Sequence, residues 1–340
     1  MKLATYRPKS ALGLATSRVG AVATFGEAVQ LVDLQRAYAT LLRDDGDPRA
    51  DEVARARLPA QMKLLLEGGA RSLQAARDAL QYIGAALRSN EGSALAALAA
   101  AGVLYPLGSV SLQAPLPRPG KIIGVGANYR EHVEEGRATG ALNRIPPYPP
   151  AFLKMPSAVI GPDEPIRYPS FGNELDYEVE LAMIIGAHCH DVSVEVALDV
   201  VAGFTIVNDL GLRDVIFEER EIGVVTSGKN FPTSCPLGPV IVTPDEIGDP
   251  YKLKMECRVN GAVRSSGVSD GMLFPFEEMI AHISQDETLM PGEFIGSGTV
   301  GKGCGLELGW YLEDNDEIEL EVEKIGILKN RVERQQALDI

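Results

Sequence analysis

The chain has 340 residues, of which 45% are hydrophobic and 23% charged, a balance typical of a globular enzyme or binding protein. Its formal net charge of −15 argues against partners such as nucleic acid or an anionic membrane surface, because both are bound by basic patches. This length is more than one core usually needs, so we expect two domains.

The first part of the chain mixes short strands with helices. Segments 1–8, 11–17 and 19–25 have the pattern of strands, and the Ala- and Leu-rich segments 27–43 and 54–100 have that of helices. The proline-rich stretch 113–121 has no hydrophobic period and is typical of a linker. We therefore predict an N-terminal α+β domain over 1–115 and a second domain over 116–340.

The second domain is predicted to be dominated by strands, with few helices. The dipeptide Asn260-Gly261 between two apolar runs is a strong hairpin signal. Predicted strands cover 121–126, 151–155, 174–186, 201–209, 253–266 and 316–332, and predicted helices cover 129–137, 212–221 and 275–285, with another beginning near 191–195. The fold class expected for the whole chain is α+β.

Cysteine usage and the N-terminal sequence indicate a cytoplasmic protein. Cys189, Cys235, Cys257 and Cys304 form no CxxC pair, which favours reduced thiols. The first residues lack the apolar core of a signal peptide, and the longest apolar stretch is too short for a membrane span.

Three acids share one face of the predicted strand 174–186. Asp176, Glu178 and Glu180 alternate with apolar residues, so their side chains point the same way. Glu178 and Glu180 have Cα atoms roughly 6.5–7 Å apart and can converge on one cation. Asp209 ends the next predicted strand and offers a third hard oxygen ligand. This set suits Mg²⁺ or Mn²⁺; the alternative is a strand with a solvated polar face.

Three further segments carry candidate catalytic or anion-binding side chains. His132 and Glu135 are three residues apart, so on a helix they share a face and could form an acid–base pair; the alternative is a surface histidine beside a solvated acid. Lys229 lies in a rigid, non-helical setting near two prolines, where it could meet an anionic oxygen or simply be a surface charge. The glycine-rich segment 291–305 could bring Thr299 close to an anion or be an ordinary turn.

Taken in order, the motifs over about 117–333 resemble the fumarylacetoacetate hydrolase family. The resemblance implies a mixed β-roll or β-sandwich catalytic domain, a homodimer and a divalent metal, usually Mg²⁺, with Mn²⁺ or Ca²⁺ as alternatives. Residues 1–115 are similar to the variable N-terminal domain of longer members. The motifs are GVGANYREH, FLKMPSAVIGP, LDYEVELAMIIG, GFTIVNDLGLRD, GKNFPTSCPLGP, VNGAVRSSG and MPGEFIGSGTVGKG.

The resemblance also implies roles for individual residues. The metal-binding acids correspond to Glu178, Glu180 and Asp209. The acid–base dyad corresponds to His132 and Glu135, and the active-site lysine to Lys229. Substrate-binding positions correspond to Tyr129, Arg213, Gly298 and Thr299.

Two positions depart from the family pattern. Ile216 stands where members often have a glutamine that helps bind a substrate oxygen, and Val300 stands where the loop usually has proline. These departures bear on substrate choice and on the fate of the oxyanion.

The activity that the resemblance implies is hydrolysis of a C–C bond in an acylpyruvate-type 2-oxo acid, a small-molecule substrate. The metal would stabilise the enolate, His132 with Glu135 would activate water, and Lys229 would stabilise the developing charge. Decarboxylation or isomerisation of unsaturated 2-oxo diacids uses the same enolate chemistry and stays open as an alternative. A non-catalytic metabolite-binding protein is the third alternative.

Overall fold

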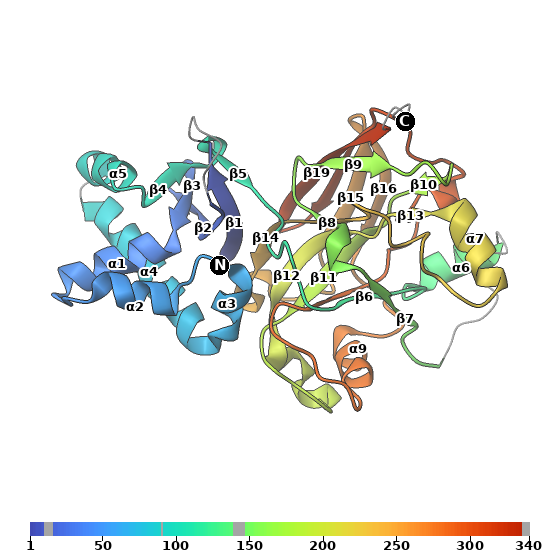
Figure 1. Cartoon of the computed structure of the whole chain (residues 1–340), viewed down its shortest axis with the longest axis horizontal. Coiled ribbons are helices and arrows are strands. Elements are labelled where there is room, and N and C mark those ends of the chain that lie inside the picture. Colours follow the sequence, from blue (N-terminus) through green and yellow to red (C-terminus); the bar gives the residue numbers. More distant parts are fainter. Residues whose placement is uncertain (10–15, 90, 139–146, 335–340) are drawn as a thin grey trace, which may run out of the picture.

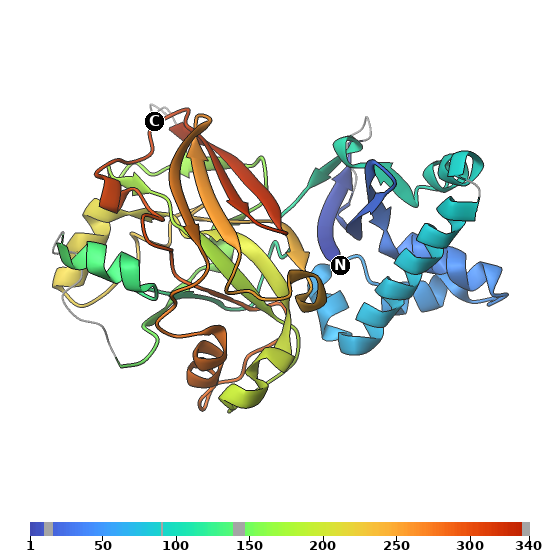
Figure 2. The same ribbon diagram turned by 180° about the vertical axis from the view of Figure 1, so that it is seen from behind.

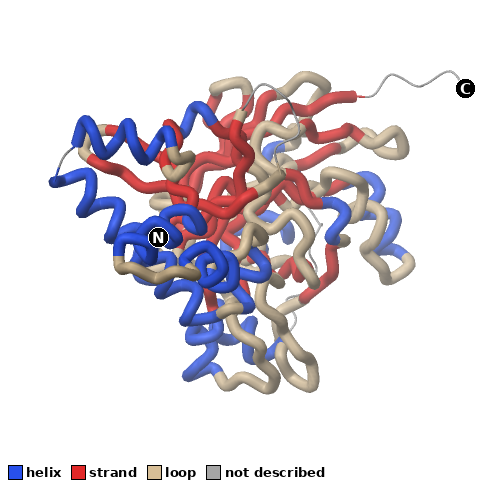
Figure 3. Tube along the Cα trace, turned by 60° about the vertical axis from the view of Figure 1, so that its left-hand side comes forward, coloured by secondary structure: helices blue, strands red, loops and turns tan. Residues whose placement is uncertain are grey.

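The computed structural model describes residues 1–9, 16–89, 91–138 and 147–334. It is a mixed α+β structure with large sheets and few helices, as predicted. Figure 1 shows the N-terminal elements on the left and the strand-rich remainder on the right. Figure 3 shows that the strands occupy the centre of the molecule, with helices around them.

The N-terminal part begins with a three-stranded meander and continues with helices. The predicted helix over 27–43 is wrong at its start, because Ala28–Asp33 is a strand that pairs with the strand before it. Asp33 then caps the following helix by accepting a hydrogen bond from the backbone N–H of Arg36 at 2.9 Å. The elements are β1 (Lys2–Pro8), β2 (Arg18–Phe25), β3 (Ala28–Asp33), α1 (Leu34–Asp44), α2 (Ala50–Arg57), α3 (Met62–Glu67), α4 (Gly69–Ser89), α5 (Glu91–Ala100), β4 (Leu104–Pro106), η1 (Leu107–Ser109) and β5 (Val110–Leu112).

The remaining elements form most of two large sheets. Turn residues Asn260 and Gly261 both have positive φ, which confirms the predicted hairpin. The elements are β6 (Ile122–Val125), α6 (Arg130–Ala138), β7 (Ala151–Lys154), η2 (Pro156–Ala158), β8 (Val159–Ile160), β9 (Pro165–Tyr168), β10 (Leu175–Asp176), β11 (Val179–Ile185), η3 (Val194–Val200), β12 (Val201–Asn208), β13 (Gly211–Leu212), α7 (Arg213–Glu221), β14 (Cys235–Val242), α8 (Pro244–Ile247), β15 (Lys254–Val259), β16 (Ala262–Val268), α9 (Phe276–Ile283), β17 (Phe294–Gly296), η4 (Leu306–Leu308), β18 (Glu317–Val322) and β19 (Gly326–Arg334).

The larger sheet runs through both parts of the chain. Its order is β4-β3-β2-β1-β14-β12-β11-β17-β6-β7, and the two parts join where β1 pairs with β14, Leu3 opposite Ile241. Leu65 of α3 belongs to the same buried cluster as Ile184 of β11, so the N-terminal helices pack on this sheet. The division into domains at 115/116 stays a prediction.

A second sheet covers one face of the larger one. It has the order β16-β15-β18-β19-β9, and Figure 2 shows its orange and red strands in front of the larger sheet. Met255 and Leu320 of this sheet share a buried cluster with Leu181 and Ile206 of the larger sheet. The main core therefore lies between the two sheets.

The predicted strand 174–186 is divided in two. β10 pairs with β13, whereas β11 pairs with β12 and β17, and the chain passes between these pairings at Tyr177 and Glu178. The break lies where the acids are, so these side chains stand at the end of the buried sheet rather than in its middle. Within the described ranges, no helix is long and apolar enough to cross a membrane.

The buried side chain of Asn128 fixes the start of α6. Its Nδ2 donates to the carbonyl oxygens of Phe274 at 3.1 Å and Ser297 at 2.8 Å, and its Oδ1 accepts from the N–H of Phe274 at 2.9 Å. One side chain thus ties the segment before α6 both to the segment before α9 and to the glycine-rich loop.

We expect Asn128→Ala to lower the free energy of unfolding by roughly 2–4 kcal/mol, because it leaves buried backbone groups without partners. Urea unfolding of the two proteins measures the difference. The control is Asn173→Ala at an exposed position, expected to stay within about 0.5 kcal/mol of wild type. An Asn128→Ala protein as stable as the control would show that this side chain does not hold α6.

Candidate active site

Three buried carboxylates meet at the ends of two antiparallel strands. Glu178 precedes β11, Glu180 lies in β11 and Asp209 follows β12. The β11–β12 register sets Val179 opposite Asn208, so the start of one strand adjoins the end of the other. One carboxylate oxygen from each acid lies within 4.8 Å of those of the other two. The structure thus brings together the acids that the sequence assigned to a metal.

Basic side chains surround this group. Lys229 Nζ lies 2.9 Å from Glu178 Oε2 and 2.9 Å from Asp209 Oδ2. Lys154 Nζ lies 2.6 Å from Asp209 Oδ1, and Arg213 lies 2.5 Å from Glu178 Oε1. Lys229 and Arg213 are therefore placed in the site that the sequence predicted for them.

Asp176 connects the acids to the loop that follows the glycine-rich segment. It is fully buried, accepts from Arg213 Nε at 2.6 Å, and accepts from the N–H groups of Gly305 at 2.6 Å and Leu306 at 3.1 Å. It lies in the interior beside Glu178, on the face that the sequence predicted for the three acids of this strand. Asp176 therefore holds the guanidinium of Arg213 in position.

The buried group contains one more acidic side chain than basic ones. If all were ionised, four carboxylates would face three cations. They are Asp176, Glu178, Glu180 and Asp209 with Lys154, Arg213 and Lys229. Burial, together with the charges of Asp209 and Glu178, raises the pKa of Glu180 well above its ordinary value. Burial acts to raise the pKa of Glu178 as well, but Lys229 and Arg213 outweigh it and hold that pKa low.

Glu180 has the properties of an unused cation ligand. Its Oε2 atom is buried and has no hydrogen-bond partner within the described chain. Gly296 of β17 leaves the space that this atom fills, since a Cβ there would lie 2.5 Å from Glu180 Oε2. A divalent cation would balance the excess carboxylate. The three oxygen ligands fit Mg²⁺ or a similar hard cation.

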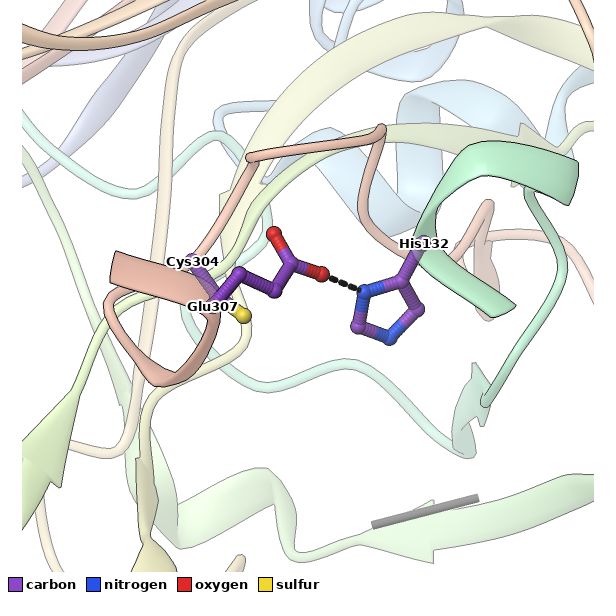
Figure 4. A group of neighbouring side chains, drawn as sticks. All are labelled: His132, Cys304 and Glu307. Carbon is purple, nitrogen blue, oxygen red and sulfur yellow. Dashed lines mark hydrogen bonds and ion pairs between the residues drawn. The ribbon is translucent and has the colours of Figure 1, made fainter. Parts of the chain in front are cut away.

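His132 is paired with Glu307. Figure 4 shows His132 on α6 and Glu307 on η4 pointing toward each other, with Nδ1 of the imidazole bound to Oε1 of the carboxylate. The sequence paired His132 with Glu135, whereas the carboxylate that binds the imidazole in the structure is Glu307; the role of Glu135 in the dyad stays a prediction. Glu135 Oε2 accepts from the backbone N–H of Lys302 at 2.9 Å, because it lies toward the glycine-rich loop. The spacing placed both residues on one helical turn but did not fix which carboxylate the imidazole meets.

The surroundings of this pair favour acid–base chemistry. Burial raises the pKa of Glu307, the hydrogen bond and charge of His132 oppose that rise, and the adjacent Glu135 adds to it. A carboxylate on Nδ1 keeps the ring proton there and leaves Nε2 to accept one. Cys304 lies in the same group (Figure 4), but burial raises the pKa of its thiol well above the ordinary value. Cys304 is therefore a neutral thiol and not a ready metal ligand.

Two of the acids and the histidine line one pocket of about 550 Å³. His132, Glu178, Glu180 and Lys229 all line it, so the acid–base pair faces the carboxylates. The other lining residues are Val125, Gly126, Ala127, Gly136, Tyr148, Pro150, Ala151, Phe152, Arg213, Ile216, Arg220, Val225, Thr299, Leu306 and Glu307. Among the described residues of segment 1–115, none lines this pocket.

The predicted substrate-binding residues have different positions. Thr299 lines the pocket, and its Oγ1 donates to the carbonyl oxygen of Val179 at 3.1 Å. Tyr129 was expected to bind substrate. It is 2% exposed, belongs to the core cluster and is not among the residues that line this pocket. Gly298 has φ of +78°, and its backbone acts to lower the pKa of Glu180. Gly298 therefore bears on the carboxylate group.

Ile216 is a buried part of the pocket wall. It is 1% exposed and packs closely on two glycines, since a Cβ at Gly211 or Gly228 would lie 2.8 Å or 2.5 Å from its side chain. No side chain at either glycine could coexist with it. The position is thus built for an apolar group.

Sequence reasoning missed two members of the site, Lys154 and Glu307. Lys154 ends an otherwise apolar strand, and its Nζ also donates to the carbonyl oxygen of Lys229 at 2.7 Å. Glu307 lies between two leucines in a short 3-10 helix. A single charge within an apolar segment is the signal that both share.

Comparisons with known proteins agree with this architecture. Residues 121–333 match the family model described as "Fumarylacetoacetate (FAA) hydrolase C-terminal". The chain is 37% identical over 276 residues to the rat "Oxaloacetate tautomerase Fahd2a, mitochondrial", covering 81% of this chain and 80% of that protein. It is 39% identical over 232 residues to the "Oxaloacetate tautomerase YisK" of Bacillus subtilis, covering 67% and 75%.

A solved structure shares the whole fold. The fumarylacetoacetate hydrolase of psychrophilic Exiguobacterium antarcticum superposes with a TM-score of 0.71 at 28% identity, covering 98% of this chain and 100% of that one. The family model spans more than half of the chain, and the similarity to the rat protein extends over most of both sequences. The chain belongs to the fumarylacetoacetate hydrolase family.

Proposed function

We propose that the protein is a divalent-metal-dependent tautomerase that interconverts the keto and enol forms of a 2-oxo dicarboxylic acid such as oxaloacetate. The observation that carries this proposal is the placement of the His132–Glu307 pair in one pocket with Lys229 and the carboxylate group. The names of the rat and bacterial relatives support the substrate, and membership in this family makes the chain an enzyme.

The reaction requires a proton to leave a carbon that lies next to a carbonyl group. Glu178, Glu180 and Asp209 would hold the cation, which, when bound, supplies Lewis-acid polarisation of the 2-oxo group. His132 Nε2 accepts the proton from C3 as the C2=C3 double bond forms. Lys229 Nζ donates a proton to the oxygen on C2. Solvent at the open side of the pocket then restores both side chains.

Hydrolysis of a C–C bond, the first expectation from the sequence, is the second candidate. The observation that favours it is again the buried Glu307 on Nδ1 of His132, an arrangement that also activates water. The solved hydrolase with the same fold supports it. Apolar Ile216 in the pocket wall favours the tautomerase, because it offers no hydrogen bond to water or to a tetrahedral oxyanion. Decarboxylation would begin from the same enolate.

For the metal site, we expect Glu180→Gln to abolish the rise in melting temperature that Mg²⁺ gives the wild type. A ligand at 100 times its Kd stabilises by about 2.7 kcal/mol, which corresponds to several degrees. Without Mg²⁺ the variant should melt at the wild-type temperature or higher, because a carboxyl group beside two acids is removed. Differential scanning calorimetry measures both effects.

The matched control for the metal test is Glu195→Gln, which removes an exposed carboxylate outside the pocket. Its response to Mg²⁺ should equal that of the wild type. A Glu180→Gln protein that still gains the full increment would exclude Glu180 as a ligand.

For catalysis, we expect His132→Asn to lower kcat for oxaloacetate tautomerisation by about 10²–10⁴-fold, the usual contribution of a general base. The loss of the ultraviolet absorbance of the enol follows the reaction. Mg²⁺ should still raise the melting temperature of the variant, because His132 is not one of the three acids. His188→Asn, at an exposed histidine, is the control and should keep full activity.

Product analysis separates the two candidate functions. Wild-type protein and Mg²⁺ are incubated with acetylpyruvate, and the products are identified by NMR. Release of acetate and pyruvate faster than oxaloacetate tautomerisation would make the protein a hydrolase and contradict the proposal. Recovery of intact acetylpyruvate, with rapid enol decay of oxaloacetate, supports the tautomerase.

The choice between Glu307 and Glu135 as the partner of His132 has its own test. Glu307→Gln should lower kcat at least about tenfold, because the imidazole loses the carboxylate that orients it and holds the proton on Nδ1. Glu135→Gln should change kcat less than about threefold, since an amide oxygen still accepts from the N–H of Lys302. Steady-state kinetics of both variants give the comparison. The reverse order of effects would restore Glu135 as the partner of His132.

A further inference from the structure

Three residues of α7 face the pocket in a row. Arg213, Ile216 and Arg220 are spaced i, i+3 and i+7, so they share one face of the helix, and all three line the pocket. Seven residues of helix span about 10.5 Å along the axis. The row therefore extends from the carboxylate group toward the outside.

The two arginines of this row occupy different environments. Arg213 is 4% exposed and committed to Asp176 and Glu178, whereas Arg220 is exposed to solvent. Arg220 is nevertheless close enough for the charges of Arg213 and Glu178 to act on it. Ile216 between them offers no hydrogen bond. Along this pocket wall, the buried cation Arg213 is therefore followed by the apolar side chain of Ile216 and then by the cation Arg220 at the outer side.

The two inner cations, Lys229 and Arg213, bind the acids that would hold the metal, and this part of the pocket is called its metal end. Those acids and the metal would bind the 2-oxo end of a substrate. A substrate that ends in a second carboxylate would extend from there past Ile216. Arg220 is the third basic side chain among the described lining residues, and its planar guanidinium matches a carboxylate through two parallel hydrogen bonds.

We propose that Arg220 binds the distal carboxylate of the substrate and so restricts the enzyme to dicarboxylic 2-oxo acids. This inference rests on the proposed function and specifies its substrate class. Ile216 takes part by leaving the middle of the wall without hydrogen-bonding groups, which assigns recognition of polar substrate groups to the two ends of the pocket.

The test compares two substrates that differ at the distal end. Oxaloacetate ends in a carboxylate, whereas acetylpyruvate keeps the 1,3-dicarbonyl unit and ends in a methyl group. Arg220→Met should raise KM for oxaloacetate about 10–100-fold and change kcat less than about threefold. Its KM for enolisation of acetylpyruvate should equal that of the wild type. Arg220→Lys should give an intermediate KM for oxaloacetate, because the ammonium keeps the charge but not the bidentate geometry.

A binding measurement gives a readout apart from turnover. Calorimetric titration with oxalate and Mg²⁺ probes the metal end alone, so wild type and Arg220→Met should bind oxalate equally. Arg167→Met, which removes an exposed arginine outside the pocket, is the matched control and should retain wild-type constants for both substrates.

Two results would overturn the inference: an unchanged KM for oxaloacetate in Arg220→Met, or equal losses for oxaloacetate and acetylpyruvate. Failure of the proposed function is recognised separately, as a wild type that does not turn over oxaloacetate. The thermal shift produced by oxaloacetate and Mg²⁺ then decides about Arg220. A shift present in wild type and lost in Arg220→Met supports the carboxylate site, and equal shifts, or none in either protein, refute it.

Discussion

Mutual repulsion among buried carboxylates is the constraint on which the site depends. Acids this close cannot all ionise in the interior unless positive charge balances them. Lys154, Arg213 and Lys229 supply most of that positive charge. Burial and the negative charges of the neighbouring acids raise the pKa of Glu180. A divalent cation would complete the balance. The same requirement explains why bases from three separate segments converge on Asp209 and Glu178.

The sheet provides the rigid frame for this arrangement. Antiparallel pairing of β11 with β12 sets the ligand-bearing ends side by side, and β17 on the other side of β11 offers Gly296, whose missing side chain leaves room for Glu180. Asn128 then joins α6 to the same region, so that His132 reaches Glu307 across the pocket. The three acids and the His132–Glu307 pair are thus held by elements far apart in sequence.

Local pattern predicted the strands and most helices well, because apolar periodicity and turn residues act over a few positions. It failed at 28–33, where pairing with β2 overrides the helical tendency, and at 174–186, where a change of pairing partner divides one apolar run. The strand β14 (Cys235–Val242) was not predicted, because its two prolines are unusual within a strand. In the large sheet it lies between β1 and β12 and so joins the two halves.

The sequence by itself determined the family, the three acids, the histidine and the lysine, because ordered motifs and alternation along a strand are visible in one dimension. Tertiary structure alone decided which carboxylate meets His132, that Tyr129 faces the core, and that Lys154 belongs to the site. These contacts depend on how distant segments pack, and a spacing of three residues on a helix fixes a direction but not a partner. For the same reason, only the folded pocket sets Arg220 beyond Ile216 on one wall.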